Sequence, residues 1–310
     1  GEYAGIGILV SDREEQLKVV EVFPGSPAER AGLRSGDVIV SVEGRLVEVA
    51  QFEQALEALR GEPGARVTLE VLRGDDPEPR SFELVREFVH ADSTEVSTLE
   101  SAAGTVALVH LETFQQGLVP ELVRKLGALE DVSGLILDLR NNPGGLLEAA
   151  VELSDLFLPG GRLIVEARTT ISSQDHRSRD LFLQERWNEV PVLVLVNPQS
   201  ASASEILAAA LKYHRRALVL GQKTYGKGTI QSAWEAKSGE GIKLTIGEYR
   251  LPDGTSLHQR GLEPDELVEE TLSKTSPPPL DEQPSIQRSL QLLAEYAATS
   301  QGWAEFLESR

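Results

Sequence analysis

The sequence contains no cysteine, and this absence excludes catalytic thiols, disulfide bonds and thiolate metal sites. It is compatible with an oxidising compartment without establishing one. Basic residues are also scarce, because 30 Lys and Arg stand against 49 Asp and Glu, for a net charge of −19 at pH 7. Nucleic acids and anionic membranes reward basic surfaces, so we expect neither as a partner.

Long hydrophobic runs are missing too, and no apolar run approaches the roughly 20 residues that a membrane-spanning helix needs. The chain begins at Gly1 rather than at a methionine, so we expect a processed or truncated start, and the lack of a targeting segment says nothing about the compartment. The composition is that of an ordinary globular protein, with 40% hydrophobic and 25% charged residues. A length of 310 residues leaves room for two or three domains.

Residues 1–87 are predicted to form a compact domain of strands with two helices. Alternating or apolar runs closed by turn residues predict the strands, residues 38–42 among them. A short helix is expected to begin at Ser26 and to end at Gly32, and apolar residues at helical spacing predict a second helix within residues 47–59.

The segment GSPAERAGLRSGDVIVSVEG, residues 25–44, resembles the signature of a PDZ domain, in the arrangement found in bacterial periplasmic proteases. Backbone N–H groups in a glycine-rich turn can hold a terminal carboxylate, and a bound peptide then adds to the sheet as an extra strand. The alternative is that the glycines only permit a tight turn. The resemblance implies a peptide-binding loop and strand made of five residues: Tyr3, Gly5, Ile6, Gly7 and Ile8.

Residues 88–272 are predicted to form an α/β core. Residues 132–159 are predicted to form a buried strand, a glycine-containing turn and a helix. Residues 190–214 repeat this order with a serine-rich turn. This alternation predicts that both turns lie at the same edge of a sheet. The polar stretch 160–190 is expected to be either a flexible loop near a site or an exposed connection.

Residues 273–310 read as a proline-rich linker followed by a helix. The helix is expected to pack on the body of the protein or on a second subunit, because its apolar residues recur at helical spacing: Ile286, Leu290, Leu293 and Ala297. Upstream, residues 242–257 predict a hairpin with its turn at Pro252-Asp253-Gly254.

The residues with the clearest chemical potential lie within the stretch 200–231. Ser202 is expected at the entry to a helix that follows a buried strand, where a hydroxyl is exposed and fixed. The N–H of Ala203 would be an unpaired donor at the helix start, suited to a developing oxyanion. Asn142-Pro143-Gly144-Gly145 offers free amides at another helix start. Gly145 is the candidate second donor, because glycine lets a substrate carbonyl approach the backbone closely.

Lys227 is the candidate base. Gly226 and Gly228 flank it, so its side chain has little local steric cover. To accept a proton the lysine must be neutral, and burial in an apolar pocket favours the neutral amine. Such an amine can take the serine proton and return it to the leaving amine. Gln231 lies four residues on, and in an extended segment it would point to the same side and hydrogen-bond the lysine.

Together these residues resemble one family, the carboxyl-terminal processing (tail-specific) proteases, which are serine endopeptidases with a PDZ domain. The resemblance covers about residues 3–265, and the matching segments stand in the family's order: GSPAERAGLRSGDVIVSVEG, LILDLRNNPGG, SASASEI and GQKTYGKGTIQ. It implies that Ser202 is the nucleophile, Lys227 the general base and Gln231 the residue that supports the base. It also implies two oxyanion donors: Gly145 and Ala203.

The same resemblance implies a PDZ domain in residues 1–87, an α/β protease core in 88–272 similar to the ClpP/crotonase-like fold, and a linker with a C-terminal helix in 273–310. It implies no cofactor and no metal. Substrates would be proteins or peptides with apolar C-termini, in the periplasm or another exported compartment. A homo-oligomer or a regulatory partner stays open, because the helical segment that precedes the PDZ domain in the family is not in this sequence.

The same residues allow other interpretations. Ser202 and Glu205 fit the capping box S-x-x-E, in which the serine only caps a helix. Residues 221–228 nearly match a phosphate-binding loop, but Gly228 stands where Ser or Thr must bind Mg²⁺, and a strand is predicted to follow. His214 lies about three helical turns from Ser202, too far for a histidine triad. The alternative function is a peptide-binding protein on a catalytically silent protease scaffold.

Overall fold

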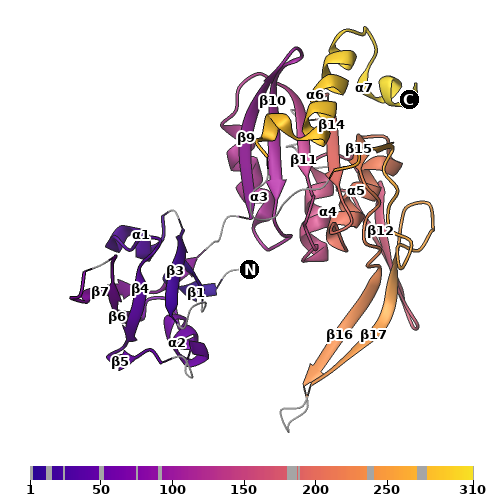
Figure 1. The fold of residues 1–310 in the computed structure, drawn as a ribbon. Coiled ribbons are helices and arrows are strands. Elements are labelled where there is room, and N and C mark those ends of the chain that lie inside the picture. Colours follow the sequence, from indigo (N-terminus) through magenta and orange to yellow (C-terminus); the bar gives the residue numbers. More distant parts are fainter. Residues whose placement is uncertain are drawn as a thin grey trace. The chain divides into compact units, whose positions relative to one another are not determined.

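Two compact units make up the chain, residues 1–92 and residues 93–310 (Figure 1). The computed structural model describes the following residues: 3–11, 16–23, 25–48, 52–74, 76–89, 93–179, 187, 189–235, 241–270 and 278–309. The first unit extends beyond residue 87 because β8 (Glu87–Val89) pairs with β1 (Tyr3–Gly5). None of the helices in these ranges is long and apolar enough to cross a membrane.

The first unit is built around a six-stranded sheet with the strand order β2-β3-β4-β6-β7 and with β5 beside β4. Its other elements have these bounds: β2 (Ile8–Ser11), β3 (Leu17–Val22), α1 (Pro27–Ala31), β4 (Val38–Val42), β5 (Arg45–Leu46), α2 (Phe52–Leu59), β6 (Arg66–Leu72) and β7 (Arg80–Val85). Alternate residues of β6 are buried, as expected for a strand with one face on a core: Val67, Leu69 and Val71.

Both predicted helices of the first unit are present. The Ser26 hydroxyl accepts a hydrogen bond from the Glu29 N–H and begins α1. Gly32 ends this helix with a φ of 84°, a left-handed conformation that glycine adopts without strain. Within the described residues α2 begins at Phe52, later than the start predicted at residue 47.

The second unit contains a six-stranded sheet with the order β18-β15-β14-β11-β10-β9. The strands from β18 to β10 run parallel, and β9 is antiparallel to β10. The bounds are as follows: β9 (Thr94–Ser101), β10 (Gly104–Leu111), α3 (Leu118–Gly127), β11 (Val132–Asp138), α4 (Leu147–Asp155), β14 (Val192–Val196), α5 (Ala203–Tyr213), β15 (Ala217–Gly221) and β18 (Glu266–Leu267). The alternation of strands and helices confirms the predicted α/β core.

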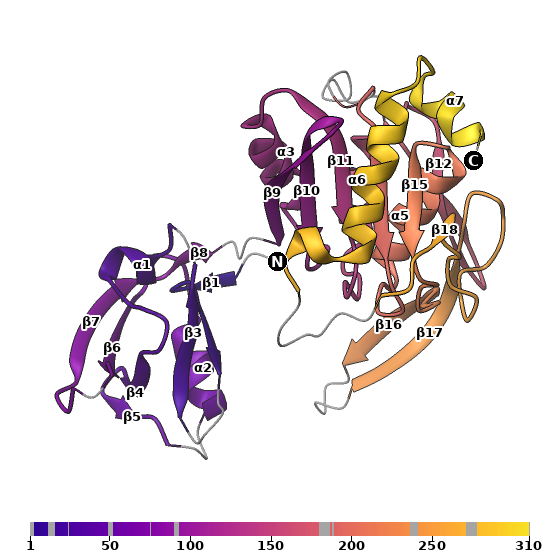
Figure 2. The ribbon, with the colours of Figure 1, turned by 45° about the horizontal axis from the view of Figure 1, so that its top comes forward.

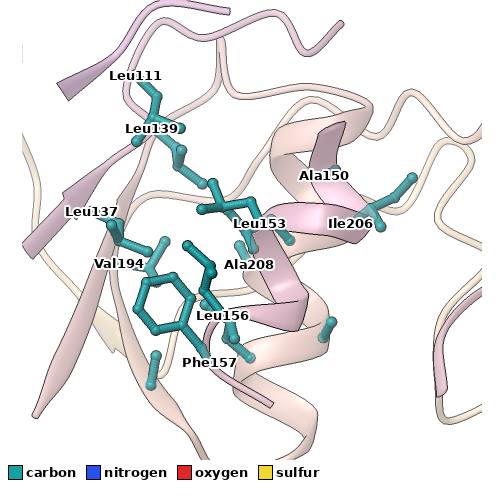
Figure 3. Close-up of a cluster of buried hydrophobic side chains, with 14 of the residues drawn as sticks. Leu111, Leu137, Leu139, Ala150, Leu153, Leu156, Phe157, Val194, Ile206 and Ala208 are labelled. Atoms are coloured by element: carbon teal, nitrogen blue, oxygen red, sulfur yellow. The ribbon is translucent and has the colours of Figure 1, made fainter. Parts of the chain in front are cut away.

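Helices cover both faces of this sheet (Figure 2). Leu137 and Leu139 belong to the core that includes α3, α4 and α5, whereas Ile136 belongs to the core on the opposite face, because successive side chains of a strand alternate. Figure 3 shows Leu137 and Val194 from the strands in one cluster of buried side chains with Leu153 of α4. The sheet is therefore the middle one of three layers.

The C-terminal tail packs on the body of the second unit through α6 (Pro284–Ala297) and α7 (Trp303–Glu308), after a short 3₁₀ turn (Leu280–Glu282). Of the predicted stripe, Ile286 and Leu293 are buried and Leu290 is half-buried, whereas Ala297 at the end of α6 is exposed. Leu293 packs against Gly134 of β11, where a Cβ would lie 2.8 Å from Leu293 Cδ1. The sequence did not predict α7, whose Trp303 donates from Nε1 to Arg216 O at 3.0 Å.

A second sheet of the same unit has the order β13-β12-β17-β16. Its strands have these bounds: β12 (Leu163–Thr169), β13 (Ser173–Arg177), β16 (Thr229–Glu235) and β17 (Gly241–Arg250). Part of the polar stretch 160–190 is thus a β-hairpin rather than a loop. The hairpin predicted over residues 242–257 is wrong in its second strand. A turn forms at residues 252–254, but only Arg250 bridges Ser256, because β17 pairs with β16 and β12 instead.

Candidate active site

Three loops meet at the carboxyl edge of the second unit's main sheet. They follow the adjacent parallel strands β11, β14 and β15: residues 139–146, 197–202 and 222–228. The carboxyl ends of parallel strands lie at one edge, so the loops are neighbours. The first two loops are the turns that were predicted to share an edge. Backbone hydrogen bonds join them, because Ala201 N–H donates to Asn142 O and Tyr225 N–H donates to Ser200 O, each at 3.0 Å.

Ser202 occupies a strained turn between β14 and α5. Its φ of 57° and ψ of −113° lie outside the regions that L residues favour, at a cost of about 1–3 kcal/mol. The residue is half-buried and stands at the N-cap position of α5. An ordinary N-cap residue has an extended backbone, so capping does not account for the strain. A strained turn between a strand and a helix presents a serine hydroxyl at the sheet edge, as a nucleophile requires.

Glu205, in the first turn of α5, ties Ser202 to the loop that carries Lys227. Its side chain is fully buried. Glu205 Oε2 accepts the N–H of Ser202 at 2.8 Å and the N–H of Lys227 at 2.9 Å. Glu205 Oε1 accepts the N–H of Gly226 at 2.7 Å and the hydroxyl of Thr224. The capping box that the sequence indicated for Ser202 and Glu205 is present. The further bonds from the loop of Lys227 also make Glu205 a clamp between the candidate nucleophile and the candidate base.

Asn142 organises the loop after β11 from a fully buried position. Its Nδ2 donates to Leu111 O and its Oδ1 accepts the N–H of Gly144, both at 2.8 Å. Its carbonyl oxygen accepts the N–H of Ala201 at 3.0 Å. The loop is therefore fixed both to β10 and to the turn that carries the candidate nucleophile.

Gly144 packs directly against that turn. A Cβ at Gly144 would lie 2.6 Å from Ala201 O. It would also lie 2.9 Å from Ser202 Cβ and from Ala203 N, so only glycine fits. Among the described residues, the N–H groups of Gly145 and Ala203 donate no hydrogen bond. Both predicted oxyanion donors are thus unpaired beside the serine, the state in which backbone amides can bind an oxyanion.

The side chains of the predicted catalytic residues are not joined in this conformation. Lys227 and Gln231 are exposed, so the apolar burial expected for a neutral lysine is not present. Within the described part of the chain, no hydrogen bond links the side chains of Ser202, Lys227 and Gln231. Their common direction was expected from unbroken alternation, but Lys227 precedes β16 and the strand register shifts between Ile230 and Gln231. The three catalytic roles therefore stay predictions.

A buried network of charges lies where β11 leads into the Asn142 loop. Arg140 donates from Nη2 to Asp138 Oδ2 at 2.6 Å and from Nη1 to Glu270 Oε2 at 2.7 Å. Burial alone would raise the pKa of Asp138, but hydrogen bonds from Arg140 and His110 outweigh it and lower this pKa to about 2. The same hydrogen bond with Asp138 raises the pKa of His110.

Arg140 also holds the C-terminal tail. It donates to Gln283 Oε1 at 2.8 Å and to Ser285 Oγ at 2.9 Å, which fixes the start of α6 beside the start of the Asn142 loop. Asp138 lies in the first of the two predicted buried strands, and the sequence analysis assigned no role to Arg140 or His110. The available signal was a pair of charged residues within the apolar run LILDLR, since buried charges need partners.

Residues considered for other chemistries lie in other surroundings. His214, at the C-terminal end of α5, has its Nε2 2.7 Å from Leu163 O. The loop 222–228 leads into β16, not into the helix that a phosphate-binding loop requires. In the described ranges, no group of His, Asp and Glu side chains is arranged to hold a metal ion.

The first unit carries a groove of about 410 Å³. Most of its lining comes from β2, α2 and the turn before β2: Gly5, Ile6, Gly7, Ile8, Leu9, Val10, Phe23, Leu56, Leu59 and Arg60. Four of the predicted peptide-binding residues are among them. The fifth, Tyr3, pairs with Val89 in the β1–β8 ladder, and its side chain falls outside the described part of the chain.

The turn at one end of this groove has unpaired backbone donors. Gly7 has a φ of 80°, and the described residues include no acceptor for the N–H groups of Ile6 and Gly7. Arg60 is the charged residue of the lining. The N–H of the next residue, Gly61, donates to Ala4 O at 3.3 Å, which holds the end of α2 beside the turn. An apolar groove with free amides and one cation at its end suits a peptide with a terminal carboxylate.

Two family models match the sequence. The model of peptidase family S41 matches residues 105–268, and the model of the PDZ domain matches residues 18–73. The S41 match lies in the second unit and includes all three loops of the candidate active site. The PDZ match lies in the first unit and includes the residues predicted for that domain's signature.

Named relatives cover most of this chain. A carboxyl-terminal-processing protease of Synechocystis sp. (strain ATCC 27184 / PCC 6803 / Kazusa) is 36% identical over 277 residues, which are 88% of this chain and 64% of the relative. A probable CtpA-like serine protease of Staphylococcus aureus (strain COL) is 35% identical over 271 residues, 87% of this chain and 53% of the relative. The chain thus spans between about half and two thirds of the length of these curated relatives.

Solved structures of similar fold include the photosystem II D1 C-terminal processing protease, with a TM-score of 0.52, 28% identity and coverage of 96% of this chain and 78% of that one. A putative S41 protease from Bacteroides fragilis NCTC 9343 has a TM-score of 0.56, 19% identity and coverage of 94% and 83%; at this identity it supports the fold alone. Since the S41 model matches residues 105–268 of 310, more than half of the sequence, the chain belongs to peptidase family S41.

Proposed function

We propose that this chain is a serine endopeptidase that binds the C-terminus of a protein substrate in the PDZ groove and cleaves the substrate with Ser202. Lys227 is the general base, and Gln231 supports it. The observation that carries the proposal is the Glu205 clamp: a buried carboxylate holds a strained serine at a helix start to the backbone of a lysine. Two unpaired amides lie beside the same serine.

In the proposed reaction, neutral Lys227 Nζ accepts the Ser202 Oγ proton while Oγ attacks the scissile carbonyl carbon. The N–H groups of Gly145 and Ala203 bind the oxyanion of the tetrahedral intermediate. The C–N bond then breaks, and the lysine ammonium gives its proton to the leaving amine. A water molecule hydrolyses the acyl-enzyme by the same sequence of steps, with Lys227 as the base.

The proposed mechanism requires that the Lys227 side chain be shielded from water during the reaction. In the present conformation Lys227 is exposed. A peptide bound across the three loops would exclude water from the lysine, and desolvation favours the neutral amine. The proposal therefore treats the present conformation as a resting one, which substrate converts to the active one.

The proposed substrate is a protein whose apolar C-terminal residues fill the groove between β2 and α2. Its carboxylate would accept hydrogen bonds from the N–H groups of Ile6 and Gly7, and its backbone would pair with β2 as an added strand. The apolar lining of the groove supports this choice of tail. We also propose a periplasmic or otherwise exported location, on the resemblance to exported proteases, with a homo-oligomer or a regulatory partner left open.

A catalytically silent peptide-binding protein is the second candidate. The observation in its favour is that Lys227 is exposed and that its side chain is not hydrogen-bonded to Ser202 or Gln231 within the described chain. Both candidates bind tails, and only the first one cleaves. Activity on an unfolded protein with an apolar C-terminus therefore separates them.

The experiment compares wild type with Ser202→Ala and Lys227→Ala. We expect each substitution to lower kcat by about 10³-fold or more while thermal melting stays cooperative. Lys223→Ala is the matched control, because Lys223 lies on the same loop and pairs with exposed Glu263; its activity should equal that of wild type. Cleavage by Ser202→Ala would disprove the nucleophile. A wild type that binds tails and cleaves nothing would establish the silent binding protein.

A further inference from the structure

A tight turn at residues 257–261, called the Gln259 turn below, packs against the loop that carries the proposed base. The N–H groups of Arg260 and Gly261 both donate to Leu257 O at 3.2 Å and close this turn. Gln259 has a φ of 59°, a left-handed conformation in which Gly and Asn are usual and other side chains are disfavoured. Strained residues cluster at functional sites, so the neighbours of this turn are informative.

Both glycines beside Lys227 fit closely against the Gln259 turn. A Cβ at Gly228 would lie 2.4 Å from His258 N, and a Cβ at Gly226 would lie 2.9 Å from Gly261 N. The turn therefore leaves no room for a side chain at either position, whereas Lys227 between them is exposed. The two glycines let the turn approach the backbone of the proposed base on the side that the lysine side chain does not occupy.

Hydrogen bonds hold the same loop from the side of the Gln259 turn. Gln259 N–H donates to Gly226 O at 2.9 Å, and Tyr249 N–H of β17 donates to Gly228 O at 2.7 Å. Glu205 accepts N–H groups of this loop. The backbone around the proposed base is thus held through its N–H groups by one support and through its carbonyl groups by another.

Thr224, earlier on the loop, joins the two supports. Its buried hydroxyl donates to Glu205 Oε1 and accepts the N–H of Leu262 at 2.7 Å. Its own N–H donates to Leu262 O at 3.1 Å. Leu262 directly follows the Gln259 turn, so the turn and the Glu205 clamp are parts of one hydrogen-bonded structure around the loop.

We infer that Gln259 is a positioning residue for Lys227: its left-handed backbone holds the Gln259 turn against the two glycines and thereby fixes the direction in which the lysine leaves its loop. The inference rests on the proposed function. Lys227 acts twice in that reaction, because it accepts the Ser202 proton and later gives a proton to the leaving amine. Both transfers need the amine in one place, so a backbone shift of about 1 Å slows them.

A misplaced lysine should slow the cleavage of amides more than that of esters. Both substrates need Ser202 to lose its proton, but only the amide needs a proton on its leaving group, because p-nitrophenolate leaves as the anion. The measured quantity is therefore the ratio of kcat/KM for a peptide amide to that for the p-nitrophenyl ester of the same acyl group. This ratio within one protein does not depend on the folded fraction, which a merely structural role would change.

The first test replaces Gln259 by Val or by Asn. A β-branched residue is an outlier at positive φ, whereas Asn tolerates it, so Val must distort the turn and Asn preserves it. We expect Gln259→Val to lower the amide-to-ester ratio by roughly tenfold and Gln259→Asn to keep a ratio close to that of wild type. Asp131→Val is the matched control, because Asp131 has a φ of 50° but precedes β11 and so lies at the opposite edge of the sheet. Its ratio should equal that of wild type.

The second test moves the turn without backbone strain. Gly228 does not have a positive φ, so Gly228→Ala acts through the contact of its Cβ with His258 N and should lower the ratio by roughly tenfold as well. Gly127→Ala, with no positive φ and no neighbour within 4 Å of the added carbon, should leave the ratio unchanged.

The outcomes separate the inference from the proposed function. An unchanged ratio in Gln259→Val or in Gly228→Ala, the same fall in either control, or a fall in Gln259→Asn as large as that in Gln259→Val overturns the positioning role and leaves the proposed function standing. A wild type that cleaves no peptide overturns both.

Discussion

Ser202 and Lys227 are joined through a single oxygen atom, because both backbone N–H groups donate to Glu205 Oε2, at 2.8 Å and 2.9 Å. The link fixes the backbones of the candidate nucleophile and base while the lysine side chain stays exposed. Within the described residues, the Lys227 side chain makes no hydrogen bond to Ser202. The clamp therefore positions the pair without holding it in a reactive state.

Replacing Glu205 by Gln should lower kcat by about 100-fold, with a much smaller change in KM for a tail-bearing substrate. Both carboxylate oxygens accept hydrogen bonds from N–H or O–H donors, so an amide NH₂ faces a donor in either orientation. The resulting shift of a loop by even about 1 Å misplaces the reacting groups. Michaelis kinetics on a tail-bearing protein measure the effect.

The control for this variant is Glu308→Gln, which alters an exposed ion pair with Arg215. Such pairs contribute little to stability, so its kcat should equal that of wild type. A Glu205→Gln protein with wild-type kcat would show that the clamp has no part in positioning the catalytic groups.

Substituting Gly144 by Ala should abolish measurable cleavage. The added Cβ would lie 2.6 Å from Ala201 O and 2.9 Å from Ser202 Cβ, so the nucleophile must move. Gly254→Ala is a matched control, because Gly254 has a φ of +80° against +100° for Gly144 but has no neighbour within 4 Å of the added carbon. Both variants should lose about 1 kcal/mol of stability to backbone strain, and only Gly144→Ala should lose activity. If Gly144→Ala and Gly254→Ala have equal activities, the Asn142 loop has no part in catalysis.

The main sheet could be predicted because its signals are local. The apolar run that becomes β11 and the two strand–turn–helix repeats each identify an element within a few residues, and parallel topology then places their turns at one edge. The helix α7 and the hairpin β12–β13 could not be predicted in this way. Trp303 of α7 packs at 5.1 Å from Tyr296 and 5.5 Å from Phe306, ring centroid to centroid, and such tertiary contacts leave no periodic pattern in so short a helix.

Candidate residues for the site could be named from the sequence, but their arrangement could not. Ser202 follows a buried strand and begins a helix, and both features can be read locally. The second role of Glu205 depends on contacts with Thr224 and Gly226, which lie in a loop after another strand. The direction of Gln231 was predicted from simple alternation, which the register shift next to Ile230 interrupts. Hydrogen bonds between loops and bulges within strands depend on tertiary structure.

The Asp138 network predicts a pH-dependent stability. The pKa of Asp138 is lowered from 3.8 to about 2 on folding, so the folded state favours the ionised carboxylate. This contribution, about 2 kcal/mol, is fully present above the unfolded-state pKa and is lost as the pH falls from about 4 to about 2. The free energy of unfolding of wild type minus that of Asp138→Asn should therefore be large at pH 7 and shrink below about pH 4.

Urea titrations at a series of pH values measure that difference. Asp138→Asn leaves the buried Arg140 without its nearest carboxylate, so the loss at pH 7 should reach about 3–5 kcal/mol. Asp175→Asn is the control, because Asp175 pairs with Arg177 at the surface, and its stability should follow wild type at every pH. A difference for Asp138→Asn that does not change between pH 7 and pH 3 would contradict the assigned pKa shift.

Arg60→Gln should reduce the preference of the PDZ groove for a free C-terminal carboxylate. Arg60 is the charged residue of a lining that is otherwise uncharged, and the amide of the next residue holds it beside the turn with the free N–H groups. We expect the Kd of a carboxylate peptide to rise about 3- to 10-fold, as for a partly exposed charge pair, and the Kd of the amidated peptide to stay the same. The Ser202→Ala background prevents cleavage during the titration.

Added salt shows whether Arg60 acts through its charge or through the packing of its side chain. Attraction between exposed charges is screened at high ionic strength, so the carboxylate preference of the wild type should fall with added salt towards that of Arg60→Gln. Arg45→Gln, which removes an exposed cation of the same unit outside the groove, should keep the preference of the wild type. If Arg60→Gln weakens both peptides equally, the arginine acts through its aliphatic stem against the apolar tail, and the free amides alone select the carboxylate.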